Sequence, residues 1–150
     1  MPEESAAFLA ALRALASADV LYNAAVAERL GVTATDLRCL SHLDEVGSAT
    51  PGELARWSGL TSGAVTGVVD RLSAAGLVRR EAHPTDARRV RVTPVPDQRA
   101  DVEVLMAPLG RRLLVAAEEL SAEQRDALLR FTALACEAMT QEAQRIRSGW

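Results

Sequence analysis

PGELARWSGLTSGAVTGVVDRLSAAGLVRREAHPTDARRVRVTPV, residues 51–95 of a 150-residue chain, contains the order of elements that decides the fold. Its first helix is indicated by Thr50, a hydroxyl N-cap that is followed by proline and, three residues on, by Glu53. Gly59 ends this helix, because glycine adopts the left-handed conformation of a helix C-terminus without steric cost. We expect the helix to bury three residues: Leu54, Ala55 and Trp57.

A second helix is predicted immediately after this glycine turn, with Thr61 as its N-cap and Gly76 closing it. Apolar residues recur at helical spacing and predict the buried face: Val65, Val68, Val69 and Leu72. The opposite face is small and polar: Ser62, Gly63, Thr66, Gly67, Asp70 and Arg71. Each glycine in a helix interior costs about 1 kcal/mol relative to alanine. Bare backbone on an exposed face therefore favours close approach by a large partner, such as the major groove of DNA.

Two short strands are predicted next, over residues 77–81 and 90–92, where apolar residues alternate or cluster. The segment between them, residues 83–89, contains proline, aspartate and two arginines, so we expect a tight turn that projects from the body. Helix, turn, helix and basic hairpin in this order are typical of a winged helix-turn-helix. The sequence therefore predicts a chain that binds duplex DNA.

The hairpin arginines are the predicted contacts outside the major groove. Arg88 and Arg89 lie at the turn, and Arg91 follows on the second strand. Guanidinium groups at a projecting tip can enter a narrow minor groove or bind phosphates. Asp86 is expected to hold Arg88 in an extended geometry through a carboxylate pair, which reduces the entropy that the arginine loses on binding.

Base reading is expected from the outer face of the second helix, where Ser62 and Thr66 lie four residues apart beside Thr61 and the two glycines. Arg71, at the far end of this face, is expected to hold a phosphate or a guanine. Hydroxyl groups discriminate weakly between bases. We therefore expect modest sequence specificity, with a share of the selectivity arising from DNA shape sensed by the hairpin.

The charge distribution agrees with this assignment, although the chain as a whole carries a net charge of −3. Residues 61–96 contain six arginines against three acidic residues, whereas residues 1–60 and 97–150 are both acidic overall. The predicted second helix and hairpin thus form the one basic region of the sequence. Dimerisation would double this basic surface.

The motifs of residues 30–95 resemble the MarR family of bacterial transcriptional regulators. They include Gly-Leu-Thr-Ser-Gly-Ala-Val-Thr from residue 59, Ala-Gly-Leu-Val-Arg-Arg from residue 75 and Pro-Thr-Asp-Ala-Arg-Arg-Val from residue 84. The resemblance implies a recognition helix over residues 62–75, a wing motif made by Asp86 and Arg88, and insertion of Arg88 into the minor groove. It also implies flanking helices that interlock into a homodimer, and a pseudo-palindromic DNA operator.

Two departures from the family pattern bear on these expectations. Gly67 stands where a larger, often basic, residue is common in the family, which weakens any inference about base readout. Thr93-Pro94-Val95 replaces the usual end of the second wing strand, so we expect that strand to be short.

The rest of the chain is predicted to be helical, giving a mostly α fold in a single domain of residues 1–150. Residues 33–96 would form the winged-helix DNA-binding lobe, and residues 1–32 and 97–150 the helical dimerisation region. Apolar residues recur along the last predicted helix: Leu128, Phe131, Leu134, Ala135, Ala138, Met139 and Ile146. This surface predicts either a dimer interface or packing within the monomer.

Members of the family often release DNA when a small aromatic or phenolic compound binds between the dimer scaffold and the DNA-binding lobes. On helix positions carried over from the family, Tyr22, His42 and Met106 are candidates to line such a pocket. Ordinary core packing is the alternative for each of them.

The sequence contains few residues or motifs that indicate a metal site, a redox site or catalysis. Cys39 and Cys136 stand 97 positions apart and belong to no Cys-x-x-Cys pair, so we expect buried thiols and no metal site. A redox-responsive regulator that senses through Cys39 is the alternative. No phosphate-binding loop, nucleophile elbow or His-Glu-x-x-His motif occurs, so neither an enzyme nor a cofactor is expected.

Two further expectations concern location and an alternative function. No continuous run of 18 apolar residues and no secretion signal occurs, so we expect a cytoplasmic protein without a membrane partner. A winged helix used for protein contact without DNA binding is the competing function. Small residues on the exposed helix face disfavour it, because protein interfaces rely on aromatic anchors.

Overall fold

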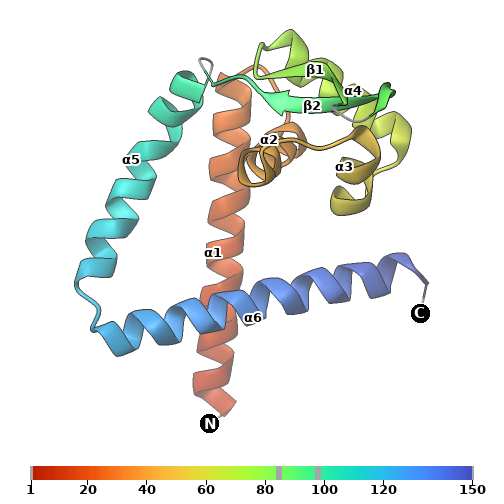
Figure 1. The fold of residues 1–150 in the computed structure, drawn as a ribbon. Coiled ribbons are helices and arrows are strands. Elements are labelled where there is room, and N and C mark those ends of the chain that lie inside the picture. Colours follow the sequence, from red (N-terminus) through yellow and green to blue (C-terminus); the bar gives the residue numbers. More distant parts are fainter. Residues whose placement is uncertain (1, 84–85, 97–98, 150) are drawn as a thin grey trace. The chain divides into compact units, whose positions relative to one another are not determined.

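The structure, a computed structural model, describes residues 2–83, 86–96 and 99–149, and leaves aside the side chains of residues 2, 83–88 and 97–99. The chain divides into two compact units, Met1–Met106 and Ala107–Trp150. Within the described residues it is mostly helical, with one two-stranded antiparallel sheet, as the sequence predicts. Figure 1 labels the elements in chain order: α1 (Pro2–Arg29), α2 (Ala34–Val46), α3 (Pro51–Ser58), α4 (Ser62–Ala74), β1 (Val78–His83), β2 (Asp86–Pro94), α5 (Arg99–Glu118) and α6 (Ala122–Arg147).

The core of the first unit lies where α2, α3 and α4 meet the sheet and the end of α1. The predicted inner face of α4 is confirmed, because all four of its apolar residues are at most 1% exposed. They pack with residues from each neighbouring element: Val26, Leu37, Leu43, Leu54, Val78 and Val92. This aliphatic core fixes which side of α4 faces outward.

The predicted helix ends are confirmed at α3. The Thr50 amide donates to the Glu53 carboxylate at 2.7 Å, and the Glu53 amide donates to the Thr50 hydroxyl at 3.3 Å. Gly59 closes the helix in the left-handed conformation, with φ of 70°. Leu54 is buried, but the expectation for Trp57 is wrong: its side chain is 43% exposed. On α3 it faces the side of α2, where its ring stacks on His42.

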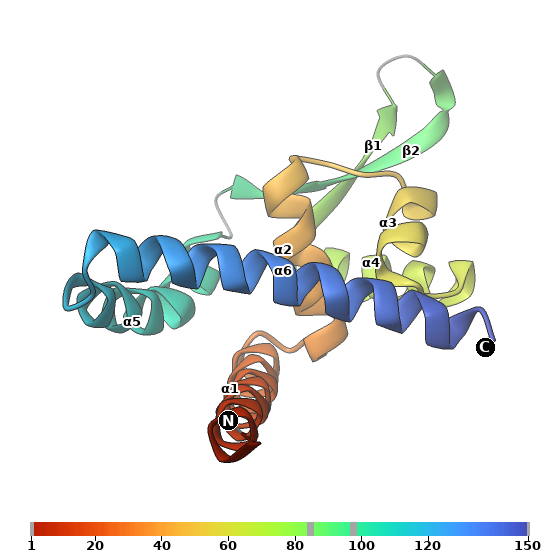
Figure 2. The same cartoon turned by 90° about the horizontal axis from the view of Figure 1, so that it is seen from below.

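The wing strands are longer than the sequence suggests. β1 and β2 pair antiparallel, and Val78 lies opposite Pro94 at the base of the hairpin. Figure 2 shows the hairpin extending beyond helices α2 to α4. The expectation that Pro94 shortens the second strand is wrong. Proline has no N–H to donate, but the amide of the next residue, Val95, donates to the Leu77 carbonyl at 3.0 Å. The pairing of the two strands therefore continues past Pro94.

A third segment joins the sheet through Ala49, which pairs with Val92 of β2. The Ala49 amide donates to the Val92 carbonyl at 3.1 Å, and the Val92 amide donates back at 2.8 Å. Ala49 immediately precedes the capped start of α3. The bridge therefore ties the beginning of the helix-turn-helix to the base of the wing.

Helix α1 is apolar over most of its length, yet few of its residues are buried. Val26 and Ala27 reach the core at its C-terminal end, whereas Leu15, Val20 and Leu21 are each at least 66% exposed. By length and composition, the stretch Glu3–Arg29 could cross a membrane, with mean hydropathy 1.3 over an 18-residue window. The same composition suits a helix whose apolar surface packs against a partner chain.

The second unit consists of the later part of α5 and the whole of α6. Ser121 and Gln124 form the predicted capping box, with the Ser121 amide donating to the Gln124 side chain at 2.8 Å. No residue of α6 is buried among the described residues. Large apolar side chains are exposed on both helices: Leu113, Leu114, Val115, Leu128, Leu134, Met139 and Ile146. Such a surface is unusual for a monomer in water.

Candidate nucleic-acid interface

The N-terminal half of α4 presents small polar groups. Thr61 is the N-cap, and its hydroxyl accepts the Ala64 amide at 3.2 Å. Ser62, Gly63 and Thr66 are exposed. The Thr66 hydroxyl donates to the Ser62 carbonyl at 3.0 Å, which leaves its lone pairs as acceptors for an outside donor. This face can approach another molecule closely and offers hydroxyl oxygens to it.

The two glycines of α4 differ in their surroundings. A Cβ on Gly63 would have no described atom within 4 Å, so this position is open. A Cβ on Gly67 would lie 3.2 Å from Nη1 of Arg71, one turn further along the helix. Only Gly63 therefore leaves bare backbone facing open space.

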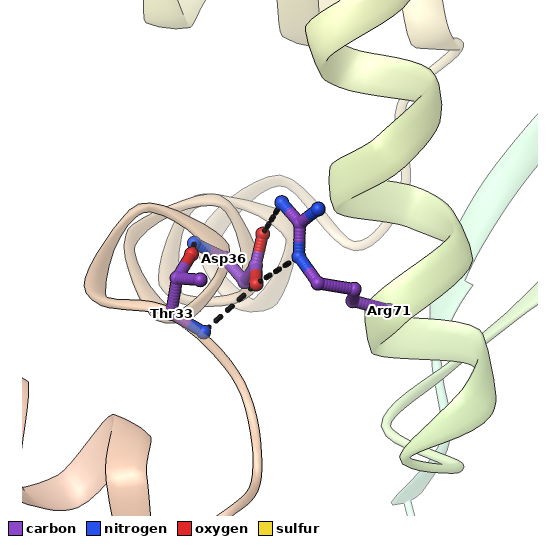
Figure 3. A network of polar contacts seen from close by, with 3 residues as sticks. All are labelled: Thr33, Asp36 and Arg71. Carbon is purple, nitrogen blue, oxygen red and sulfur yellow. Dashed lines mark hydrogen bonds and ion pairs between the residues drawn. The ribbon is translucent and has the colours of Figure 1, made fainter.

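Arg71 and Asp36 form a bidentate ion pair that the sequence did not predict (Figure 3). Nε of Arg71 donates to one carboxylate oxygen of Asp36 and its Nη2 to the other, both at 2.8 Å. Asp36 belongs to the first turn of α2, where it also accepts the Thr33 amide at 2.8 Å and completes the predicted capping box. Its side chain is fully buried, whereas that of Arg71 is 47% exposed. The pair occupies two of the three guanidinium nitrogens that Arg71 would offer to DNA.

The pKa of Asp36 reflects both its burial and its partners. Burial raises the pKa, but hydrogen bonds from Arg71 and Thr33 outweigh it, so the net pKa lies below the ordinary value. A carboxyl whose folded-state pKa is depressed stabilises the fold above its unfolded-state pKa. That stability is lost as the pH falls through the folded-state pKa.

We therefore expect Asp36→Asn to lower the free energy of unfolding at pH 7, with the difference from wild type shrinking below about pH 4. Urea unfolding at a series of pH values measures this difference. Glu118→Gln, at an exposed position of α5, is the control and should show no such pH dependence. A constant gap between wild type and Asp36→Asn from pH 7 to pH 3 would contradict the assignment.

The base of the wing is held by ion pairs and hydrogen bonds. Arg80 of β1 donates to Asp70 of α4 at 2.5 Å, which links the wing to α4. Glu81 accepts Nε of Arg79 at 2.5 Å and the Thr93 hydroxyl at 3.0 Å, and these bonds lower its pKa. Three charged residues on the strands are thus engaged within the wing or with α4.

The predicted wing contacts lie in different surroundings. Arg91 is half-buried, and its guanidinium donates to the Ser48 hydroxyl, so it braces the base of the wing. Arg89 is exposed on β2. The pKa of Glu53 is lowered by hydrogen bonds from Thr50 and, to a smaller extent, by the charges of Arg56 and Arg89.

The side chains of Asp86 and Arg88 fall outside the described residues, although both lie on β2. Their pairing and the minor-groove role of Arg88 stay predictions. Of the turn predicted over residues 83–89, His83 belongs to β1 and the residues from Asp86 onward belong to β2, whereas residues 84–85 lie outside the described residues.

None of the cavities described for residues 2–83, 86–96 and 99–149 is lined by Tyr22, His42 or Met106. Tyr22 is half-buried, and its hydroxyl donates to the Leu105 carbonyl at 3.2 Å. The His42 ring stacks on Trp57 with ring centroids 4.0 Å apart, and Met106 packs against the core. A hollow of about 370 Å³ does lie nearby, but it has other lining residues: Arg29, Leu30, Ala75, Leu77, Asp101, Val104 and Leu105.

The two cysteines have opposite environments. Cys39 is fully buried in α2, and burial raises the pKa of its thiol, which disfavours the reactive thiolate. This environment weighs against redox sensing through Cys39. Cys136 is exposed on α6, so the expectation that both thiols are buried is wrong for this residue. Among the described residues, no cluster of three potential metal ligands occurs.

The order α2, α3, α4, β1 and β2, with Ala49 bridged to the wing, defines a winged helix-turn-helix protein. Residues 30–89 match the model of the MarR family. The chain is 36% identical to YcgE of Bacillus subtilis, which is described as an uncharacterized HTH-type transcriptional regulator. The alignment spans 135 residues, which are 90% of this chain and 88% of that protein. The chain belongs to the MarR family and is a transcriptional regulator.

Other relatives agree with this assignment. The multiple antibiotic resistance protein MarR of Salmonella typhimurium is 36% identical over 74 residues, which cover 49% of this chain and 51% of that protein. The crystal structure of RV1404 from Mycobacterium tuberculosis superposes with a TM-score of 0.68 at 27% identity, covering 89% of this chain and 90% of that one. The similarity to RV1404 extends to the helices on both sides of the wing.

Proposed function

We propose that the chain is a cytoplasmic, homodimeric repressor that binds a pseudo-palindromic DNA operator and leaves it when a small aromatic or phenolic ligand binds. In this proposal α4 enters the major groove and the wing reaches the adjacent minor groove. The DNA-contacting residues are those of the α4 face and the wing: Thr61, Ser62, Gly63, Thr66, Gly67, Arg88, Arg89 and Arg91.

The observation that carries DNA binding is the exposed face of α4, which is small and polar where its opposite face is fully buried. A recognition helix inserts between two DNA backbones, and small side chains on this half let its backbone approach the base edges closely. Ser62 and Thr66 supply hydroxyl oxygens there, and the basic wing extends beside it. These are the groups that a groove-binding surface requires.

The exposed apolar surface supports the homodimer. Leu15, Val20 and Leu21 on α1, and the apolar residues of α5 and α6, expose more apolar surface than a monomer in water usually carries. In a two-fold dimer, the two recognition helices reach successive major grooves about 10 base pairs apart. The division into a winged-helix lobe, residues 33–96, and a helical dimerisation region, residues 1–32 and 97–150, belongs to this proposal.

The wing is tested by Arg88→Ala. We expect this change to weaken operator binding by about 1 to 3 kcal/mol, because it removes a guanidinium from the minor groove, and to leave the thermal unfolding temperature unchanged. Fluorescence anisotropy with a labelled duplex measures the affinity. Arg130→Ala, at an exposed arginine of α6, is the control for a general loss of charge. Equal affinities of Arg88→Ala and wild type across a salt titration would rule out the wing contact.

The ligand-release part of the proposal rests on the hollow beside Leu105. Its volume is within the range of small-molecule sites, and Arg29 could pair with the carboxylate of a phenolic acid. We expect hydroxybenzoates to raise the thermal unfolding temperature and to dissociate the DNA complex. Val104→Trp, which fills the hollow from an exposed position, should abolish both effects and spare DNA binding. Val46→Trp, at an exposed site on α2, should behave as wild type.

A further inference from the structure

We propose that Asp36 is a positioning residue of the recognition helix, that it acts through Arg71, and that position 67 is glycine because the Arg71 guanidinium lies beside it. Asp36 belongs to no surface that DNA can reach, since its side chain is fully buried. Arg71 then serves DNA binding by fixing α4, in place of the direct phosphate or guanine contact expected from the sequence. The functional half of this inference rests on the proposed DNA binding by α4.

The ion pair between Asp36 and Arg71 has a fixed geometry. Two parallel hydrogen bonds of 2.8 Å define both the distance and the plane of the guanidinium, which a single bond would not do. Asp36 is itself held, because its carboxylate also accepts the Thr33 amide at the start of α2. Arg71 is thereby fastened to a fixed point on α2 (Figure 3).

Gly67 leaves space for the Arg71 guanidinium. A Cβ at this position would come within 3.2 Å of Arg71 Nη1, closer than the roughly 3.5 Å of an ordinary contact between heavy atoms. Nη1 is at the end of a flexible side chain, but Nε and Nη2 of the same guanidinium are hydrogen-bonded to Asp36 and restrict its movement. A side chain at 67 would therefore press on the ion pair. The open surroundings of Gly63 show that this pressure is specific to one of the two glycines.

The ion pair lies next to a second ion pair of α4. Arg71 follows Asp70, whose carboxylate accepts Arg80 of the wing at 2.5 Å. Through two adjacent residues, Asp70 and Arg71, α4 thus forms one ion pair with β1 and one with α2. The wing tie is exposed at both ends and contributes little, whereas the α2 tie has a buried carboxylate. The tie to Asp36 is therefore the one expected to hold the angle at which Ser62 and Thr66 meet the groove.

The decisive experiment compares wild type, Asp36→Asn, Arg71→Gln and the double variant. Affinity and its salt dependence are measured by anisotropy on a duplex that wild type selects from a random pool. We expect each single variant to bind about tenfold more weakly, the double variant to bind no more weakly than the worse single, and the salt slope to stay unchanged. Thermal unfolding is followed in parallel to confirm that each variant is folded at the assay temperature.

Direct contact with DNA gives a different pattern. If Arg71 binds a phosphate, Asp36→Asn releases its guanidinium and keeps or raises affinity, while Arg71→Gln lowers the salt slope by about one. That pattern would overturn the inference. Binding of no duplex by wild type would instead overturn the proposed function, and the wild-type measurement distinguishes the two failures.

A second measurement avoids any change at Asp36 and needs no DNA. Gly63→Ala should raise the thermal unfolding temperature by about 3 °C both in wild type and in the Arg71→Gln background, because alanine favours the helix. Gly67→Ala should raise it less in wild type than in Arg71→Gln, where Nη1 is absent. Equal gains from Gly67→Ala in the two backgrounds would show that position 67 does not press on the pair and would overturn that half of the inference.

Discussion

A variant with glutamate in place of both Leu128 and Met139 is expected to sediment as a monomer and to bind the operator at least about 100-fold more weakly than wild type. Both side chains are exposed, by 50% and 62%, and both lie on one stripe of α6 with Ile146. Buried in an interface, two carboxylates per chain would carry a large desolvation cost. Once separated, the protomers bind half-sites independently and lose the gain of simultaneous contact. Sedimentation velocity and anisotropy on the same samples measure both effects.

The matched control places the same charges on α6 outside this stripe. Leu129 and Ala133 are exposed residues of α6 that lie off the stripe. Leu129→Glu combined with Ala133→Glu should leave a dimer with unchanged DNA affinity. A dimer that survives in the Leu128 and Met139 variant would place the interface away from this stripe.

Leu72→Ala is expected to lower the free energy of unfolding by about 2 to 5 kcal/mol. Leu72 is fully buried on the inner face of α4, so the truncation leaves a cavity between α4 and the rest of the core. Urea unfolding measures the loss. Leu129→Ala, at a side chain that is 68% exposed, should change stability by no more than about 0.5 kcal/mol. A loss below about 1 kcal/mol at Leu72 would mean that this face of α4 does not pack as described.

The parts of the fold that sequence reasoning predicted are those with local causes. Thr50, Thr61 and Ser121 each cap a helix through bonds within three residues, so the pattern alone identifies them. The inner face of α4 follows from the 3.6-residue period and is confirmed by burial. Family motifs then extended this local information to the wing and to the recognition helix.

The errors have non-local causes. Trp57 was expected to be buried because it is large and apolar, but its surroundings depend on His42, which lies 15 positions earlier on α2. The second strand was expected to be short because of residues 93–95, but β2 reaches Pro94 and the Val95 amide donates to the Leu77 carbonyl beyond it. Neither partner can be inferred from the residues next to Trp57 or Pro94 in the chain.

The ion pair between Asp36 and Arg71 was missed for the same reason, since 35 positions separate its partners. Two features of the sequence were compatible with it: an acidic residue in the first turn of α2, and a glycine four residues before the arginine on α4. Both already had local explanations, as part of a capping box and as bare backbone for DNA. Only the tertiary arrangement of α2 and α4 gives each of them a second role.

A hydroxyl-radical footprint on the DNA that flanks the chain's own gene, with the number of bound chains measured by sedimentation, tests the central proposal most directly. We expect two chains per duplex and a protected region with two-fold symmetry, with half-sites about 10 base pairs apart from centre to centre. Arg88→Ala should remove protection only at the minor-groove positions that the wing reaches. One chain per duplex with an asymmetric footprint, or no protection at low salt, would contradict the proposal that this regulator is a two-fold dimer on DNA.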